Sequence, residues 1–246
     1  MSHLEGRVAL VTGGSRGIGA AIAQRLARDG ADVALTYAGA SERAHAIVDA
    51  ISAGGHRAIA IAADNADPAK IEGAVKQAVS AFGKIDILVN NAGIFPTGSL
   101  ETLSIEVFDE TFSVNVRSVF VASKIAAAHM GDGGRIISIG SNFAERIPGP
   151  GLSLYAASKA ALVGLTKGMA RDLGPRGITV NIVQPGSTNT DMNPANGPNV
   201  SQQLGRMAIP RFGETTDIAG FVSWLAGDES RFITGAALTI DGGASA

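Results

Sequence analysis

Residues 8–19 read VALVTGGSRGIG, in which four apolar residues run directly into a turn with glycines at positions 13, 14, 17 and 19. A short apolar run bounded by glycines predicts a buried strand, and the residues beyond the turn repeat with a helical period. Glycine permits the tight turn and lets backbone N–H groups and the start of a helix approach a pyrophosphate. We therefore expect this stretch to bind a dinucleotide. Plain strand-to-helix packing is the alternative that the turn by itself leaves open.

The same alternation continues along the rest of the chain. Apolar runs predict strands at 8–11, 33–35, 58–61, 85–89, 136–139 and 178–183, and helical periodicity predicts helices at 17–28, 42–53, 68–82, 106–130, 154–173 and 216–226. Strands that are apolar on both faces and alternate with helices are typical of a parallel sheet covered on both sides. We expect an α/β protein with one Rossmann-type, doubly wound domain over residues 1–246, because no shift in composition marks a second one.

Two segments depart from this pattern. Prolines and glycines interrupt residues 186–212, and a long irregular stretch in a compact domain is usually a binding loop, so we expect a substrate lid there. Simple mobility is the alternative. The apolar run at 236–240 predicts an edge strand, and because edges are commonly covered we expect a homo-oligomer.

Composition excludes several functions. Lys and Arg total 20 against 22 Asp and Glu, so the excess positive charge that nucleic-acid binding needs is missing. The absence of cysteine excludes disulfides, thiolate nucleophiles and cysteine-ligated zinc. The four histidines never fall at the i, i+4 spacing of a helical metal site, and we expect no metal. No apolar run approaches the roughly 18 residues of a membrane span, so we expect a cytoplasmic protein without a membrane partner.

Tyr155 and Lys159 lie four positions apart at the start of the helix expected at 154–173, so their side chains share one face. An adjacent ammonium favours the phenolate form of tyrosine. Lowering the phenol pKa by about 3 units takes roughly 4 kcal/mol, which a partly buried cation and a positively charged nicotinamide can supply together. The pair therefore predicts a general acid and base. A solvent-facing helix pair is the alternative.

The end of the second strand indicates which dinucleotide binds. An NAD-specific site places Asp or Glu there to bind the ribose 2′-hydroxyl, but residues 34–39 read ALTYAG, with Tyr37 where the acid would stand. Arg16 can pair with a 2′-phosphate, and Ser41, an expected helix N-cap, can donate a hydrogen bond to it. We expect NADP(H) as the cofactor. A solvated loop cation and a plain helix cap are the alternative interpretations of Arg16 and Ser41.

Several motifs appear together in one order along the chain: Thr12-Gly13-x3-Gly17-x-Gly19, Asn90-Asn91-Ala92-Gly93, Asn115, Ser141, Tyr155-x3-Lys159 and Pro185-Gly186. In these the chain resembles the short-chain dehydrogenase/reductase family over nearly its whole length, and within it the 3-oxoacyl-acyl-carrier-protein reductase group. The resemblance implies a homotetrameric oxidoreductase that moves a hydride between NADP(H) and a small ketone, β-keto ester or 3-oxoacyl group.

The resemblance also implies roles for individual residues. Tyr155 would donate the proton, Lys159 would lower the Tyr155 pKa and bind the nicotinamide ribose, and Ser141 would hydrogen-bond the substrate oxygen. Asn115 would hold a water in a proton relay; a satisfied buried amide is the alternative. The family usually has twelve residues between its serine and tyrosine, which would select Asn142. We prefer Ser141, with one extra residue in the loop at 148–151.

The remaining implied contacts fall into three groups. The phosphate loop would contribute Gly13, Ser15, Arg16, Gly17, Ile18 and Gly19, and the adenosine half would contact Tyr37, Ser41, Asp64, Asn65, Asn91, Ala92 and Gly93. The nicotinamide carboxamide would lie against Pro185, Gly186, Thr188 and Thr190. The substrate would contact Phe95, Ser141, Asn142, Phe143 and Ile147.

This substrate set is largely apolar, which favours a compact free carbonyl compound over a carrier-bound thioester. Residues 126–132, just before the fifth strand, also lack the basic residues that would dock an acidic carrier, and Arg171 alone is a poor substitute. Two other functions stay open. One is an NAD-linked polyol dehydrogenase, which the missing acid at Tyr37 disfavours. The other is a non-catalytic nucleotide sensor on the same fold, which the intact Ser141, Tyr155 and Lys159 disfavour.

Overall fold

The computed structural model describes residues 3–39 and 41–246. Seven strands form one all-parallel sheet in the order β3-β2-β1-β4-β5-β6-β7. The strands are β1 (Val8–Val11), β2 (Asp32–Tyr37), β3 (Ala58–Ala62), β4 (Ile87–Asn90), β5 (Arg135–Ile139), β6 (Thr179–Pro185) and β7 (Ala237–Ile240). The expected α/β, Rossmann-type doubly wound fold is confirmed. Strand β7 lies at the sheet edge, as the run at 236–240 predicts.

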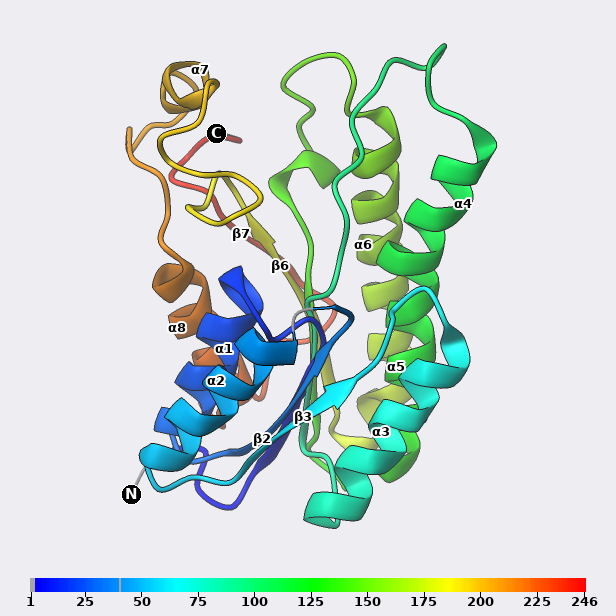
Figure 1. Cartoon of the computed structure of the whole chain (residues 1–246). Helices are drawn as coiled ribbons and strands as arrows, with labels where there is room; N and C mark the ends of the chain where they lie inside the picture. The colour runs from blue at the N-terminus through cyan, green and yellow to red at the C-terminus, as the bar shows by residue number, and fades with distance from the viewer. Residues whose placement is uncertain (1–2, 40) are drawn as a thin grey trace.

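Helices cover both faces of the sheet (Figure 1). One layer holds α1 (Gly17–Arg28), α2 (Ser41–Ala53) and α8 (Thr215–Ala226). The other holds α3 (Pro68–Phe82), α4 (Ile105–Phe112), α5 (Ser118–His129) and α6 (Ser153–Leu173). Each layer packs its apolar face on the sheet, which produces one large buried core on each side. Because both faces are covered, the central strands are largely buried and rich in apolar residues.

The helix expected at 106–130 is interrupted. Helices α4 and α5 are joined by a π-helical turn, η1 (Ser113–Arg117), in which the Ser118 N–H donates to the Ser113 carbonyl five positions back. The apolar periodicity continues through this turn, so the pattern predicts one helix and does not reveal the extra residue. Such π-turns are frequent at functional sites, and this one contains Asn115.

The segment at 186–212 contains one short helix, α7 (Val200–Leu204), and is otherwise irregular. Its irregular part is braced by side chains. The amide groups of Asn193 and Gln203 exchange two hydrogen bonds of 3.0 Å, and Ser187 donates to Gln203 at 2.5 Å. The segment therefore has a defined path over the carboxyl ends of the strands (Figure 1).

Two further features bear on partners. Within residues 3–39 and 41–246, no helix has both the length and the apolar character that crossing a membrane requires. In the same ranges no group of three or more His, Asp or Glu side chains is arranged to hold a metal ion.

Candidate active site

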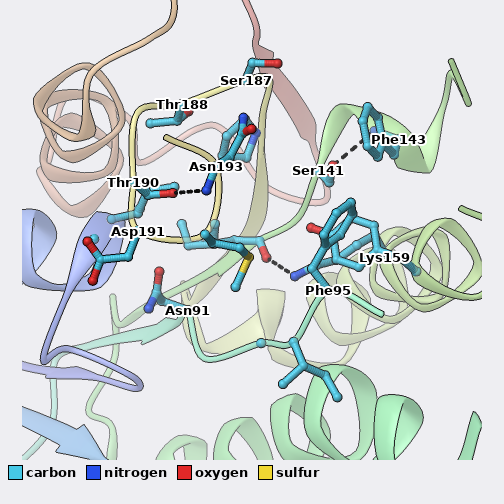
Figure 2. A pocket seen from close by; sticks show the side chains of 18 of the residues that line it. Asn91, Phe95, Ser141, Phe143, Lys159, Ser187, Thr188, Thr190, Asp191 and Asn193 are labelled. Atoms are coloured by element: carbon cyan, nitrogen blue, oxygen red, sulfur yellow. Dashed lines mark hydrogen bonds between the residues drawn. The ribbon is translucent and has the colours of Figure 1, made fainter. Parts of the chain in front are cut away.

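A cavity of about 1460 Å³ opens at the carboxyl ends of the strands, beneath the segment 186–212. In the close view, Ser141, Phe143 and Lys159 lie on one side, while Thr188, Thr190 and Asp191 lie on the other (Figure 2). The cavity wall brings together nearly every residue proposed from the sequence: Gly13, Ser15, Arg16, Gly17, Ile18, Gly19, Tyr37, Asp64, Asn65, Asn91, Ala92, Gly93, Phe95, Ser141, Asn142, Phe143, Ile147, Tyr155, Lys159, Pro185, Gly186, Thr188 and Thr190. Ser41 and Asn115 do not line it.

The loop between β1 and α1 fits a pyrophosphate. Gly13 and Gly17 have φ values of +64° and +55°, which favour glycine. A Cβ at Gly19 would lie 2.3 Å from the Gly13 carbonyl oxygen, so only glycine allows this close approach. The first turn of α1 has neither an acidic residue nor a side-chain cap, so its N–H groups are available to an anion.

Asn91, just beyond β4, holds this loop in shape. Its Nδ2 donates to the carbonyl oxygens of Thr12 and Gly13, both at 3.0 Å, and its own N–H donates to Thr12 Oγ1 at 3.0 Å. Sequence analysis assigned Asn91 to the adenosine wall. The structure shows that its side chain also braces the phosphate loop.

One cation that sequence analysis did not identify lies in the region expected to bind the 2′-phosphate. Arg16 and Tyr37 line the cavity there, and so does Arg43, in the first turn of α2. Arg43 Nη1 forms an ion pair at 2.7 Å with Asp191, 148 positions later in the chain. Ser41 instead donates to the Tyr37 hydroxyl at 3.4 Å. The fold thus places an acidic residue, Asp191, beside the expected 2′-phosphate site, where its carboxylate is paired with Arg43.

Ser141, Tyr155 and Lys159 meet between the end of β5 and the first turns of α6. The Ser141 hydroxyl is hydrogen-bonded to the Tyr155 phenol, and its oxygen accepts from the Phe143 N–H at 3.2 Å. The Asn142 amide donates instead to Asp241 and Ser245, at 3.3 and 3.4 Å. Of the two candidates, Ser141 is therefore the side chain in contact with Tyr155.

Burial dominates the electrostatics of this pair. It raises the pKa of Tyr155 to about 12, opposed by the hydrogen bond from Ser141. It also lowers the pKa of Lys159 to about 8. The Lys159 ammonium lies 5.7 Å from the Tyr155 ring centre and donates to the Ile139 carbonyl at 2.9 Å. In the protein alone the Tyr155 pKa is thus shifted opposite to the expected direction, because desolvation outweighs the hydrogen bond from Ser141.

Asn115 lies behind the cavity wall and is 1% exposed. Its Oδ1 accepts from the Ile94 N–H at 2.9 Å, and its Nδ2 donates to the Ile94 carbonyl and to Ser158, both at 3.0 Å. These bonds satisfy the amide, as the buried-amide alternative requires. A Cβ at Gly93 would stand 3.2 Å from Asn115 Oδ1 and 3.5 Å from Lys159 Nζ, so both polar groups lie close to Gly93. The water relay stays a prediction.

The substrate end of the cavity is aromatic. The Phe95 ring packs edge-on against Tyr155 with ring centroids 4.5 Å apart, and the Phe143 ring centroid lies 6.3 Å from that of Tyr155. Met192 and Met207 line the cavity from the segment 186–212, and so does Ala244 near the end of the sequence. Met192 and Met207 fall within the lid expected at 186–212, although sequence analysis did not single them out, whereas Ala244 was missed because no local pattern links it to Tyr155.

Comparisons place this chain among known proteins. Residues 13–245 match the family model described as Enoyl-(Acyl carrier protein) reductase. The chain is 46% identical over 242 residues, 98% of both chains, to the cyclic-di-GMP-binding biofilm dispersal mediator protein of Escherichia coli K12. It is 42% identical over 238 residues, 96% of both, to the 3-oxoacyl-[acyl-carrier-protein] reductase FabG of Staphylococcus aureus Mu50. A crystal structure of a short chain dehydrogenase from Burkholderia cenocepacia J2315 in complex with NADP matches with a TM-score of 0.98 and 61% identity, covering 99% of this chain and 100% of that one.

Proposed function

Because the chain belongs to the short-chain dehydrogenase/reductase family, we propose that it is an NADPH-dependent reductase that turns a small apolar ketone into a secondary alcohol. The observation that carries the proposal is the contact between Ser141 and a buried Tyr155 whose raised pKa keeps its phenol protonated at neutral pH. A protonated phenol flanked by Phe95 and Phe143 is suited to give a proton to a carbonyl oxygen.

The cofactor is NADP(H), as in the Burkholderia relative that is 61% identical. The chain's own residues fit it: the uncapped start of α1 and the close-packed glycines suit the pyrophosphate, and Arg16 and Arg43 suit the 2′-phosphate. We propose that residues at Pro185, Gly186, Thr188 and Thr190 hold the nicotinamide end. Bound NADPH supplies the hydride that the carbonyl carbon receives.

Each residue of the triad has a distinct task in this proposal. Ser141 donates a hydrogen bond to the carbonyl oxygen, and the hydrogen bond that its own oxygen accepts from the Phe143 N–H helps to orient it. Tyr155 transfers its proton to the same oxygen as the carbon receives the hydride. Lys159 then lies beside the resulting phenolate and stabilises it, and Asn115, whose Oδ1 lies near Gly93 as does Lys159 Nζ, supports the return of a proton to Tyr155.

The aromatic walls indicate the substrate class. Phe95 and Phe143 flank Tyr155, which favours a compact ketone with a flat or apolar body. The 42% identity to a 3-oxoacyl-[acyl-carrier-protein] reductase makes β-keto esters and 3-oxoacyl groups the next compounds to test. We place free carbonyl compounds first because of this apolar lining.

A second candidate is a nucleotide sensor. The observation in its favour is the 46% identity to a protein named for binding cyclic-di-GMP. The intact group of Ser141, Tyr155 and Lys159 favours the reductase. Titration with cyclic-di-GMP, in the presence and absence of NADPH, separates the two functions.

We further propose that the protein forms a homotetramer. Its expected cytoplasmic location stays a prediction. Two exposed apolar surfaces suit contacts between copies. On one, Phe108 stacks on Phe112 with centroids 4.5 Å apart, and the 49% exposed Phe120 lies on the next helix. On the other, Phe221 stacks on Trp224 and Phe232 is 99% exposed. Large exposed apolar groups of this kind mark interaction surfaces, and light scattering that gives a monomer mass would contradict the proposal.

The reductase proposal is tested with Tyr155→Phe. Steady-state reduction of a panel of small ketones and β-keto esters should fall by about 10² to 10⁴ in kcat, because the general acid is lost. NADPH affinity, measured by fluorescence titration, should stay close to that of the wild type because the ring remains in place. Substantial turnover by Tyr155→Phe would remove the mechanism, and absence of turnover in the wild type would favour the sensor.

A further inference from the structure

The last residues of the sequence reach back into the candidate active site. Strand β7 runs beside β6, and the Gly186 N–H donates to the Ile240 carbonyl at 3.0 Å. A Cβ at Gly186 would lie 2.5 Å from the Cβ of Asp241, so Gly186 packs directly against Asp241 and leaves no room for a side chain of its own. Ala244 then forms part of the cavity wall. We call residues 241–246 the end segment.

The Asp241 carboxylate organises this segment. It accepts from the Gly243 N–H at 2.9 Å and from Asn142 Nδ2 at 3.3 Å, and Ser245 donates to it as well. Partial burial by itself would raise the pKa of Asp241, but the hydrogen bonds from Ser245, Asn142 and Gly243 outweigh it and keep this pKa below its usual value. Asp241 is therefore a charged acceptor, to which hydrogen bonds are stronger than to a neutral one.

Asn142, which donates to Asp241, directly follows Ser141, the serine proposed to bind the substrate oxygen. Ser141 and Asn142 are 7% and 6% exposed and open the short helical turn η2 (Asn142–Ala144). The far side of the same loop is held too, because Arg146 Nη1 donates to the carbonyl oxygens of Ala244 and Ala246, at 3.1 and 2.9 Å. Both sides of the loop that carries Ser141 are thus fastened to the end segment.

The end segment also supports the segment 186–212. The Ile209 N–H donates to the Gly242 carbonyl at 2.9 Å, and a Cβ at Gly243 would lie 2.7 Å from the Ala208 Cβ. One short stretch therefore contacts the Ser141 loop, the turn at Gly186 and the segment over the cavity.

We propose that Asp241 is a positioning residue for the reduction, and that it holds the Ser141 hydroxyl in place through Asn142. The proposal rests on the role proposed above for Ser141. A single oxyanion donor contributes strongly only when it is held at hydrogen-bond distance from the developing charge, so a small displacement of Ser141 lowers kcat. Cofactor binding uses other residues and should change little.

An exchange of the two side chains tests this directly. Asn142→Asp replaces the 3.3 Å hydrogen bond from Asn142 to Asp241 with two facing carboxylates. This change should lower kcat by roughly tenfold or more, while NADPH affinity should stay within about twofold of the wild type. The exchange variant Asn142→Asp/Asp241→Asn restores a donor and an acceptor across the contact, and its kcat should return to within about threefold of the wild type. In Asn142→Asp alone, kcat relative to the wild type should recover as pH falls, since one carboxyl of the pair takes up a proton.

Hydrogen exchange supplies a readout that needs no substrate. In the protein without cofactor, the peptide that spans residues 141–147 should exchange faster in Asn142→Asp and return to the wild-type rate in the exchange variant. The matched control is Asp32→Asn, whose partly exposed carboxylate pairs with Arg57 at the start of β2. It should alter neither kcat nor the exchange of this peptide.

Three results would overturn the proposal: an unchanged kcat in Asn142→Asp, no recovery in the exchange variant, or additive losses in Ser141→Ala/Asp241→Ala. The double variant is expected to be no slower than Ser141→Ala, because Asp241 has nothing to position once the serine is gone. This double variant also tests the proposal if Asn142→Asp does not fold. If the wild type reduces no ketone, the proposed function fails, yet the hydrogen-exchange comparison still tests the contact between Asp241 and Asn142.

Discussion

Replacement of Lys159 by methionine should change how the stability of the protein depends on pH. Lys159 is 5% exposed, and burial lowers its pKa from 10.5 to about 8. The folded state thus prefers the neutral amine. The stability that this preference contributes is complete above the ordinary pKa of 10.5 and is lost as pH falls through about 8. A methionine of similar length carries no such dependence.

The magnitude follows from the difference between the two pKa values. Between about pH 10 and pH 7 the wild type should lose about 2 to 3 kcal/mol relative to Lys159→Met, with no further change at lower pH. At roughly 2–4 °C per kcal/mol for a chain of this size, the difference in Tm changes by about 5–10 °C. Measurements stop near pH 10 because the stability linked to the Tyr155 pKa of about 12 is lost at higher pH.

The assay is thermal unfolding of both proteins without cofactor across this pH range. Lys167→Met is the matched control, because Lys167 is exposed on the same helix and its replacement should give a constant difference in Tm. A constant difference for Lys159→Met as well would refute the reasoning, and would mean that Lys159 is charged in the folded protein at every pH tested.

Three further predictions concern binding. Arg16→Ala should lower NADPH affinity roughly tenfold to hundredfold and leave NADH affinity nearly unchanged in fluorescence titrations; equal losses would exclude a 2′-phosphate role. Gly19→Ala should weaken both cofactors alike, since its Cβ would lie 2.3 Å from the Gly13 carbonyl oxygen, while Gly73→Ala, with open space around its Cβ, should change neither. Phe95→Ala should raise KM for small ketones in steady-state assays without loss of NADPH affinity, and an unchanged KM would place the substrate elsewhere in the cavity.

The sequence predicts those features that depend on neighbours in the chain. The run at 8–19 contains both a buried strand and the glycines of the phosphate loop, so its structure follows from local pattern. Tyr155 and Lys159 are predictable for the same reason, because four positions on a helix fix a common face. The parallel sheet follows from the alternation of strands and helices, and the TM-score of 0.98 against a solved relative supports the same fold.

The features that the sequence did not predict depend on residues far apart. Arg43 meets Asp191 across 148 positions, and Asn142 meets Asp241 across 99. No local period records such contacts. The π-turn at Asn115 was missed for another reason, since one extra residue in a helix leaves the apolar pattern on both sides intact. The choice between Ser141 and Asn142 needed the fold as well, because it depends on where the Asn142 amide finds its partners.

The bond between Asn91 and the phosphate loop sets an order of events during synthesis. The loop leaves the ribosome early, but the amide that fixes its shape follows 79 positions behind Thr12. At about 5–20 residues per second, Asn91 is synthesised roughly 4–16 s after Thr12. Strand β1 waits as well, since β4, its partner on one side, ends only at Asn90. A nascent chain shorter than this should not retain NADPH, however complete its glycine motif.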